Sequence, residues 1–565
     1  MSSRLHTRRQ AIIFNTKRVL LQLKRLGRDY SLGLRKWPQS TQTFDTEIES
    51  RTPLWTDSEI PERHLQLGKV QNLRVALRQL DGVVVPAGEV FSFWKQLGRA
   101  NRFRGYVVGR ELREGCLIPA RGGGICQLSN ALYDLALKSE CEILERHSHT
   151  RVIPGSAAEI GRDATVAWNY IDLRFRPSTD LRIETKLTQD ELIVTFVFDR
   201  PLAPSASSRR LSTLKVVADN IGSCITCGES ECFRHAPEIT WKEGRPATFV
   251  VDAVTPEWVE FVRTLGGRVI APINGSTCRI ARYAWPRCDD SAPIASIRRM
   301  LDARLAVGQP PAIVRSRQLR ADRKVAIAMA NKLTAEDDAL IVAQSLLPEL
   351  WIGGHLGGRK FSVLMSRLPA LELQRRLDSA FAKFPDQKSL GDFRADEDWV
   401  RAEQEALEAA ETIITPHAGI ASIFGERGHL LEWRKATVPE GARKPERLIV
   451  FPGPTVARKG AYAVRDAARR LGLKVVVLGQ NLDSPDFWAG VDLSESTNWL
   501  DRAVALVQPS ISEDCPVALL KARAAGIPII ACDQCGLQRG EYTEVKFGDD
   551  LTEILSNLLT EELPL

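Results

Sequence analysis

The sequence predicts an α/β multidomain protein, in which an N-terminal α+β domain precedes two Rossmann-like, doubly wound domains. The chain has 565 residues, and at about 150 residues per domain this length predicts about three or four domains. The Pro- and Ser-rich stretch at 201–208 has the composition of a linker. Beyond it, short β-rich runs alternate with helical patterns, as in βαβ units with parallel sheets. Because this alternation is too long for one sheet, we expect two sheets joined near 435–447.

The part before the linker mixes helical and strand patterns. Residues 64–80 carry apolar side chains at helical spacing, whereas 38–60 are polar and are expected to form a loose connector. The expected strands lie at 83–85, 165–175, 181–187 and 191–198, the last two forming a hairpin.

The part after the linker supplies the strands of the two parallel sheets. The β-rich runs lie at 214–217, 249–251, 324–330, 412–415, 448–451, 474–478, 503–507 and 527–531. The expected organisation is a basic arm and connector (1–59), an α+β domain (60–204), a cysteine-rich segment (205–240) and two Rossmann-like domains (241–445 and 446–565).

Composition and charge exclude several classes of protein. Apolar residues make up 44% and charged residues 26% of the chain, which is typical of globular domains and excludes a disordered or collagen-like chain. No apolar run approaches the ~18 residues of a membrane span. Residues 1–37 hold ten basic residues and one acid, whereas the net charge of the whole chain is +7. The basicity therefore belongs to one segment, and no nucleic-acid partner is expected.

Two interpretations of residues 1–37 remain open. The segment is either a mobile arm or a basic amphipathic helix that lies on anionic lipid. Eleven cysteines without a secretory signal pattern indicate a reducing compartment. We therefore expect a cytoplasmic protein, peripheral at the inner face of the membrane in the second interpretation.

A first motif lies in the N-terminal domain, where three glycines (122–124) precede Cys126 and a helical pattern. The positive end of a helix dipole favours a thiolate at such a position. His149, with Arg146 nearby in sequence, and then Asp163 follow in chain order, as a nucleophile, its base and an orienting carboxylate would. The alternative is structural: Cys126 packs under the loop and the histidines bond to backbone.

This region resembles the VanW domain family over about residues 60–180. The resemblance is carried by HLQLGK (64–69), PAGEVFSFW (86–94), GGGICQ (122–127), ERHSH (145–149) and DATV (163–166). It implies no particular reaction. The order of Cys, His and Asp is also similar to that of transglutaminases and NlpC-type peptidases, by analogy only.

A second motif is a cluster of sulfur and nitrogen ligands. Four residues fall within twelve positions, which is the spacing by which a chain wraps one tetrahedral metal ion: Cys224, Cys227, Cys232 and His235. We expect a structural zinc ion, with an iron–sulfur cluster as the rival and a metal-free cysteine loop as the alternative. Cys532 and Cys535 are interpreted as packing thiols.

A third motif consists of two loops that each follow a predicted strand in the last domain. The first holds Gly453, Arg458, Lys459 and Gly460 and opens a helix, and the second holds Ser512 and Glu513. Helix N-termini and basic side chains bind phosphates, and a carboxylate accepts hydrogen bonds from sugar hydroxyls. Loops on neighbouring parallel strands meet at the carboxyl edge of the sheet.

Residues 446–545 resemble the donor-binding domain of GT-B glycosyltransferases with an E-x7-E motif. The resemblance implies that Lys459 binds the donor diphosphate and that Glu513 contacts the donor. Two positions depart from the family: Lys521 stands where the second glutamate would hold the ribose, and Pro454 where an arginine is expected. Upstream, the loop around His355 is a candidate acceptor-side loop.

The leading hypothesis is therefore a VanW-domain protein that transfers a sugar from a nucleotide-sugar to an envelope or extracellular glycan. Lys459 and Arg458 would stabilise the leaving diphosphate, Gly453, Gly460 and Ser512 would line the donor site, and His355 would serve the acceptor. One alternative is a Cys126-dependent acyltransferase or amidase with a non-catalytic nucleotide- or sugar-binding C-terminal region. Another is a non-enzymatic scaffold in glycan assembly.

Overall fold

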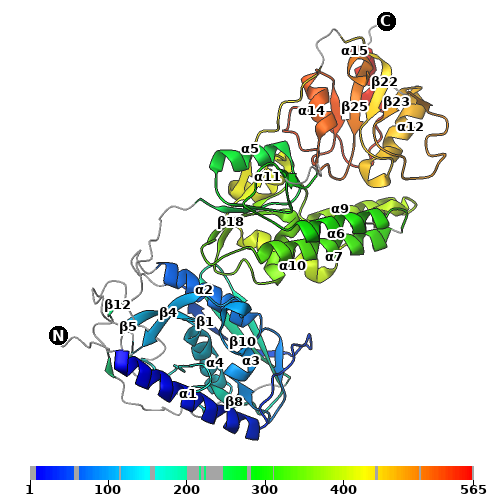
Figure 1. Ribbon diagram of the computed structural model, residues 1–565. Coiled ribbons are helices and arrows are strands. Elements are labelled where there is room, and N and C mark those ends of the chain that lie inside the picture. Colours follow the sequence, from blue (N-terminus) through cyan, green and yellow to red (C-terminus); the bar gives the residue numbers. More distant parts are fainter. Residues whose placement is uncertain are drawn as a thin grey trace. The chain divides into compact units, whose positions relative to one another are not determined.

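The chain forms two compact units, each of which is described by itself. The computed structural model describes residues 8–55, 63–113, 116–149, 151–152, 159–199, 216–217, 222–223, 246–276, 282–309, 311–392, 394–438, 443–494 and 498–562. The first unit comprises Met1–Arg245, Leu333–Asp338 and Gly353–Lys360; the second comprises Pro246–Lys332, Ala339–Ile352 and Phe361–Leu565 (Figure 1).

The first unit is built on an antiparallel sheet in the order β1-β10-β9-β2. Its strands are β1 (Thr46–Pro53), β2 (Val83–Val85), β9 (Leu181–Leu187) and β10 (Glu191–Phe198). Two smaller sheets have the orders β3-β8-β6 and β12-β5-β4. They contain β3 (Phe91–Ser92), β4 (Val108–Arg113), β5 (Cys116–Arg121), β6 (Glu142–Glu145), β8 (Arg174–Arg176) and β12 (Gly222–Ser223), and the short pair β7 (Arg151–Val152) and β11 (Val216–Val217) stands apart.

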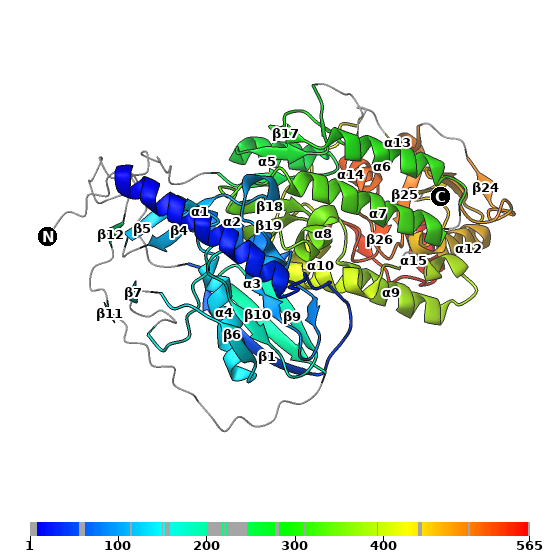
Figure 2. The ribbon, with the colours of Figure 1, turned by 60° about the horizontal axis from the view of Figure 1, so that its bottom comes forward.

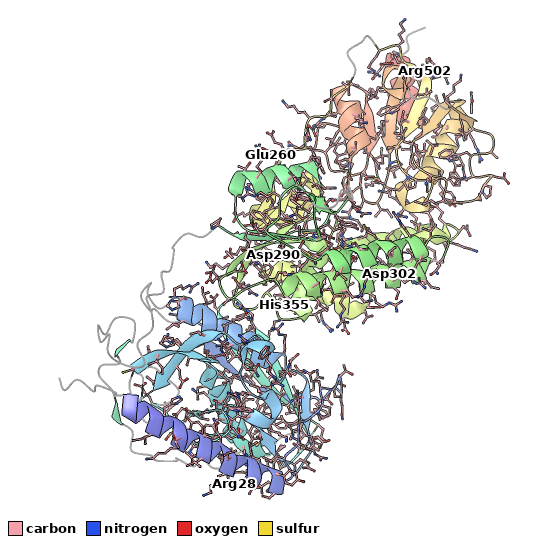
Figure 3. The ribbon with its side chains drawn as sticks, viewed as in Figure 1. Arg28, Glu260, Asp290, Asp302, His355 and Arg502 are labelled. Atoms are coloured by element: carbon pink, nitrogen blue, oxygen red, sulfur yellow. The ribbon has the colours of Figure 1, made fainter. Side chains whose placement is uncertain are left out.

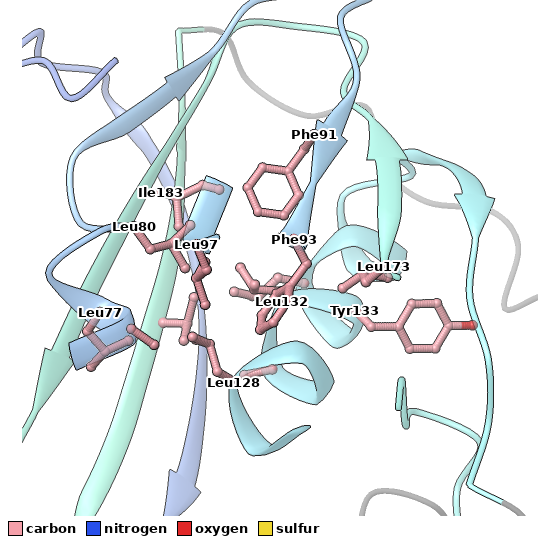
Figure 4. Close-up of a cluster of buried hydrophobic side chains, with 14 of the residues drawn as sticks. Leu77, Leu80, Phe91, Phe93, Leu97, Leu128, Leu132, Tyr133, Leu173 and Ile183 are labelled. Carbon is pink, nitrogen blue, oxygen red and sulfur yellow. The ribbon is translucent and has the colours of Figure 1, made fainter. Parts of the chain in front are cut away.

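Helices α2 (Arg63–Leu77), α3 (Phe93–Leu97) and α4 (Cys126–Lys138) complete this core. Leu128 and Leu132 on one face of α4 lie in the same buried cluster as Phe93 and Ile183 (Figure 4). The apolar side chains of α4 recur at helical spacing, so the sheet holds the helix by its inner face while its first residue stays at the edge of the core.

Helix α1 (Arg8–Ser31) docks on the first unit through a polar face. Arg25 is buried and pairs with Glu145 at 2.5 Å. The Gln22 amide donates to the Trp168 carbonyl at 3.0 Å, and the Asn169 amide donates to the Gln22 carbonyl at 2.9 Å. The structure thus has a docked helix here, which differs from the mobile arm of the first interpretation (Figure 2).

The outer side of α1 is apolar and basic. Its exposed apolar side chains are Ile13, Val19, Leu20, Leu21, Leu23, Leu26 and Tyr30. Lys17, Lys24 and Arg28 are exposed beside them, and Arg28 is labelled in Figure 3. In the parts of the chain that the structure describes, no helix combines the length and the hydropathy required to cross a membrane.

The second unit contains two parallel sheets, as predicted. The first has seven strands in the order β17-β14-β13-β18-β19-β20-β21. These are β13 (Thr248–Val250), β14 (Val269–Ala271), β17 (Asp290–Ser291), β18 (Ala339–Ala343), β19 (Lys360–Leu364), β20 (Ile413–Thr415) and β21 (Gly428–Leu430). Its helices are α5 (Pro256–Leu265), α6 (Pro293–Leu305), α7 (Pro311–Ala330), α8 (Leu347–Ile352), α9 (Ala370–Lys383), α10 (Glu397–Ala409) and α11 (Ala418–Phe424), and β15 (Ile273–Asn274) pairs with β16 (Ala284–Trp285).

The second sheet has six parallel strands in the order β24-β23-β22-β25-β26-β27. These are β22 (Glu446–Phe451), β23 (Lys474–Val477), β24 (Asp492–Leu493), β25 (Ala503–Gln508), β26 (Ile529–Ala531) and β27 (Thr543–Glu544). Ile449 and Phe451 face α12 (Ala461–Leu471) and α15 (Thr552–Glu562), whereas Leu448 and Val450 face α13 (Trp499–Arg502) and α14 (Val517–Ala524). Helices on both faces explain why the strands are apolar throughout.

Three sequence predictions are wrong. Residues 324–330 form the end of α7 rather than a strand. Of the strand expected at 165–175, only its end lies in β8. The rest is loop with a turn at 168–170, closed by the bridge between Ala167 and Ile171, and Asn169 in this turn has a φ of 58°. The expected connector contains β1, which pairs with β10 along its whole length, because an edge strand can satisfy its backbone while its side chains stay polar.

Candidate functional site

The glycine-rich loop of the first unit delivers Cys126 to the start of α4. Gly124 has a φ of 94°, and a Cβ at this position would overlap the Lys69 side chain, so only glycine fits. Asn72 donates to the Gly123 carbonyl at 2.9 Å and accepts from the Val107 amide at 2.9 Å. The VanW-like residues of α2 therefore act here as the support of the loop.

Lys69 lies buried beneath this loop. Its ammonium donates to the Leu54 carbonyl, and burial, with a contribution from Arg110, lowers the pKa of Lys69 to about 7. The neighbouring Gln127 side chain donates to Thr52 Oγ1 at 2.9 Å and to the Pro53 carbonyl at 2.8 Å. The end of β1 thus closes the loop on one side, a role that the connector interpretation missed.

His149 and Asp163 meet directly. His149 Nδ1 lies 3.1 Å from Asp163 Oδ2, and the His149 backbone N–H donates to the same oxygen at 2.8 Å. The other carboxylate oxygen of Asp163 accepts from Arg146 at 2.8 Å. Asp163 is fully buried, whereas the His149 side chain is 17% exposed. Asp163 therefore fixes the ring from its buried side.

The structure also brings Cys126 to His149. The thiol Sγ lies 3.8 Å from Thr165 Oγ1 and 3.8 Å from the Val166 carbonyl oxygen, on the segment that follows Asp163, and Cys126 is partly exposed. Burial alone would lower the pKa of His149, but the hydrogen bonds to Asp163 and Cys126 outweigh it and raise the pKa to about 9. Because Asp163 occupies Nδ1, Nε2 is the nitrogen left for the thiol. The three candidates thus form one cluster.

Two residues of α4 that the sequence analysis missed hold the Asp163 segment beside Cys126. The Ser129 hydroxyl donates to the Ala164 carbonyl at 2.6 Å, and the Asn130 side chain accepts from the Ala164 amide at 2.8 Å. They follow Cys126 by three and four positions and so share its face of the helix, which is the signal that could have revealed them.

The six-stranded sheet of the second unit has its topological switch point between β22 and β25. From β22 the chain continues outward through β23 and β24, and from β25 it continues the other way through β26 and β27. Ligands of open α/β sheets bind at the carboxyl ends of the strands at such a point. The two predicted loops follow these two strands, so they flank the position where a ligand is expected.

Lys459 and Glu513 join the two loops. Lys459 Nζ lies 2.9 Å from Glu513 Oε2 and donates to the Ser512 carbonyl at 2.8 Å. The Ile511 amide donates to the Arg458 carbonyl at 2.9 Å. Burial lowers the pKa of Arg458, although Asp514 opposes this effect.

Glycines let the loops approach each other this closely. Gly460 has a φ of 80°, and a Cβ there would overlap the Pro509 carbonyl oxygen. Gly453 stands beside the Lys459 side chain, where a Cβ would meet Lys459 Cβ at 3.3 Å.

Buried polar atoms without a partner lie on the same edge of this sheet. Within the described ranges they include Gln508 Oε1, Ser510 Oγ and Gln534 Oε1. The amide of Gln508 donates to Glu513. Since a buried polar atom without a hydrogen bond is costly, these atoms favour a ligand that would satisfy them.

A cavity of about 570 Å³ opens at this edge, and Lys459 and Glu513 lie outside its lining. Its wall includes Ser510 and four basic residues, Arg375, Arg376, Lys383 and Lys546. Arg376 is paired with Asp533 through two contacts of 2.9 Å. Glu544 and Asp549 also line the cavity, so its wall carries charges of both signs.

The remaining predicted residues lie elsewhere. His355 belongs to the first unit, where burial, with Arg78 and Arg359 nearby, lowers its pKa to about 3. The structure therefore does not place His355 in the unit that holds Lys459. The predicted metal ligands at 224–235 lie outside the described residues, and within the described ranges no group of three or more Asp, Glu, His or Cys side chains could hold a metal ion.

A buried polar cluster in the first parallel sheet was not predicted. It lies at the switch point between β13 and β18. Asp252 pairs with Arg299 at 2.7 Å and accepts from the Ser345 hydroxyl at 2.7 Å, and Arg299 also contacts Asp322 at 3.2 Å. Asp252 follows the predicted strand at 249–251 directly, which was the available signal.

The chain thus combines an antiparallel α+β unit, which carries a Cys–His–Asp cluster, with a unit of two parallel, doubly wound sheets. Residues 68–197 match the family model described as "VanW like protein", and this segment is a VanW domain. The chain is 36% identical over 137 residues to the vancomycin B-type resistance protein VanW of Enterococcus faecalis, covering 24% of this chain and 50% of that protein. It is 37% identical over 105 residues to the uncharacterized protein YoaR of Bacillus subtilis, covering 19% and 34%. The chain therefore spans half or less of these relatives.

Solved structures similar to the chain include a galactosyltransferase and a protein complexed with UDP. The lipopolysaccharide outer core galactosyltransferase WaaB in its apo form has 14% identity and a TM-score of 0.33, covering 56% of this chain and 91% of that one. Arabidopsis thaliana UGT89C1 complexed with UDP has 11% identity and a TM-score of 0.32, covering 56% and 92%. The fold of the second unit rests on its own strand pairing, described above.

Proposed function

We propose that the second unit is a glycosyltransferase that moves a sugar from a nucleotide-sugar to an envelope or extracellular glycan. The observation that carries the proposal is the Lys459–Glu513 pair, which joins the loops on both sides of the switch point. The buried polar atoms without a partner at the same edge support a polar ligand there. The resemblance of 446–545 to GT-B donor domains supplies the ligand class.

In this proposal the ion pair opens when the donor binds. The diphosphate takes Lys459, and the sugar hydroxyls donate to Glu513, so that each charged group exchanges one partner for another. Arg458 lies next to Lys459 and adds positive charge where the leaving diphosphate develops negative charge. The first parallel sheet would hold the acceptor.

The departure at Lys521 limits which donor contacts are expected. Lys521 is exposed on α14, so the ribose hydroxyls would lack the carboxylate that the family uses. Donor recognition should then depend more on the phosphates and the sugar than on the ribose.

Thermal denaturation of the full chain with UDP, GDP, UDP-glucose and GDP-mannose tests the donor site. A probe at about a hundred times its Kd stabilises its unit by roughly 2.7 kcal/mol. We expect a shift for one nucleotide class, its loss in Lys459→Ala, and its retention in Lys474→Ala, a lysine at the amino end of β23. An absent shift, or an equal shift in Lys459→Ala, contradicts the proposal and favours the scaffold alternative. Release of nucleoside diphosphate with envelope glycan as acceptor then tests transfer.

We also propose that residues 1–37 contact an anionic membrane surface. The support is the outward apolar face of α1, flanked by Lys17 and Lys24, while the polar face of the helix is used for docking. The cytoplasmic location remains part of this proposal, and it is supported by the seven described cysteines, all of which are free thiols.

A further inference from the structure

We propose that the VanW domain carries a second, thiol-dependent active site whose substrate is an acyl group held in an amide bond. Cys126 is the nucleophile, His149 is the general acid and base, and Asp163 is the residue that positions the ring. This site lies wholly in the first unit. The proposal therefore stands independently of glycosyl transfer by the second unit.

The geometry has the three relations that nucleophilic catalysis requires. The thiol lies 3.8 Å from Thr165 Oγ1, two residues beyond Asp163, and near enough to the imidazole to raise its pKa. The imidazole Nδ1 contacts the Asp163 carboxylate at 3.1 Å, and that carboxylate is anchored by Arg146 at 2.8 Å. A nucleophile, its base and a third group that orients the base define such a site by geometry, whatever the fold.

Accessibility separates Cys126 from the structural cysteine of the same domain. Cys141 is buried in the core, and burial raises the pKa of its thiol to about 11. Cys126 is partly exposed at the first turn of α4, a 13-residue helix. A substrate can therefore reach Cys126.

The position of His149 beside Cys126, on the buried carboxylate of Asp163, suits an acyl donor whose leaving group must gain a proton, such as an amide. With a pKa of about 9, the ring is protonated at neutral pH. An amine leaves an amide only after it has gained a proton, and the imidazolium supplies that proton. At the start of α4 the Gln127 N–H donates to the Gly124 carbonyl, and the Leu128 and Ser129 N–H groups donate to the Ile125 carbonyl. The Cys126 N–H is therefore the group that would face the developing oxyanion.

The proposed reaction has two steps. The Cys126 thiolate attacks the carbonyl carbon, the C–N bond breaks, and the leaving amine takes the proton of His149, which leaves a thioester on Cys126 and a neutral ring. Water or an acceptor amine then attacks the thioester while His149 removes its proton. The C–S bond breaks, and the thiolate–imidazolium pair is restored together with the acid or the new amide.

Site-resolved alkylation tests the pair without a known substrate. Iodoacetamide is applied to the full chain near pH 6, where an ordinary thiol is almost wholly protonated, and the rates at Cys126 and at the exposed Cys116 of the same unit are compared by mass spectrometry. We expect Cys126 to react at least about tenfold faster. The preference should vanish in His149→Gln and persist in His147→Gln, whose ring contacts Glu145.

Acyl transfer is tested with p-nitrophenyl acetate as the probe. We expect an acetyl group on Cys126 in preference to Cys116, no turnover in Cys126→Ala, and turnover reduced by about 10²-fold or more in Asp163→Asn. Because Asp163 acts through the ring, Asp163→Asn should also move the alkaline limb of the rate profile to lower pH, which a purely structural role would not do. The comparison of Cys126 with Cys116 uses the wild-type chain, so it does not depend on whether a variant folds. Equal alkylation of Cys126 and Cys116, a preference that survives in His149→Gln, or no acetyl group on Cys126 would overturn the proposal.

Discussion

Replacing His149 by glutamine should destabilise the first unit at neutral and acid pH, and much less at alkaline pH. Burial opposes the charge on this ring, but Asp163 and Cys126 raise its pKa from 6.5 to about 9. That change corresponds to about 3 kcal/mol of preference for the charged ring in the folded state. Because the folded-state pKa is the higher one, this stabilisation is fully present below about pH 6.5 and is lost as the pH rises through about 9.

The assay must report on the first unit alone, and the buried cysteines allow this. Cys141 lies in the core of the first unit and Cys535 in the core of the second. Pulsed alkylation along a urea series, read by mass spectrometry at each cysteine, gives separate unfolding midpoints. At Cys141 we expect His149→Gln to lose about 3 kcal/mol near pH 6 and under about 1 kcal/mol near pH 10, with no change at Cys535.

His147→Gln is the matched control, because that side chain is 49% exposed. It should change the free energy of unfolding by no more than about 0.5 kcal/mol at either pH. A loss in His149→Gln of the same size at both pH values would refute the reasoning, since it would show that the ring is held by packing rather than by its charge.

Two further predictions concern α1 and the donor loop. The full chain should sediment with phosphatidylglycerol vesicles but not with neutral phosphatidylcholine vesicles. The double variant Leu20→Glu with Leu23→Glu should weaken this binding at least about tenfold. Equal weakening by Leu265→Glu, at a leucine of α5 that is also exposed, would contradict the prediction. Gly460→Ala should cost about 1–3 kcal/mol at the Cys535 midpoint, because of its positive φ and the overlap with the Pro509 carbonyl, and should abolish the nucleotide shift; an unchanged midpoint would show that the two loops are free to separate.

The strands that could be predicted are those whose pattern admits one interpretation. The hairpin at 181–187 and 191–198 was predicted at the bounds of β9 and β10. In contrast, residues 324–330 are apolar in a window too short to distinguish a strand from a helix. The buried residues are Val325, Ala326, Met329 and Ala330, and their spacing is that of one face of a helix. The sequence reveals α7 only when the polar residues before this window are included.

The residues of the candidate site in the first unit could be predicted from the sequence, but their arrangement in space could not. Chain order suggested Cys126, His149 and Asp163 as a nucleophile, its base and an orienting group, yet it carries no distances. The meeting depends on Ser129 and Asn130, which bind the backbone at Ala164, and on Asn72, which binds the glycine loop. Such side-chain-to-backbone contacts leave no periodicity in a sequence, so pattern analysis could not find them.

Charged side chains have opposite consequences in the two proposed sites. In the first unit the pKa of His149 is raised to about 9, so a substrate would find the proposed general acid already protonated. In the second, Lys459 and Glu513 satisfy each other, and a donor must separate them before either can bind it. Both side chains are 14% exposed. When the pair opens, water therefore replaces only part of the interaction energy that each side chain loses. The stronger this pair is, the lower the donor affinity should be. Glu513→Gln should therefore tighten the binding of a nucleoside diphosphate. It should also weaken the contribution that the sugar makes to the binding of a nucleotide-sugar. Equal effects on UDP and UDP-glucose would show that Glu513 serves only to neutralise Lys459.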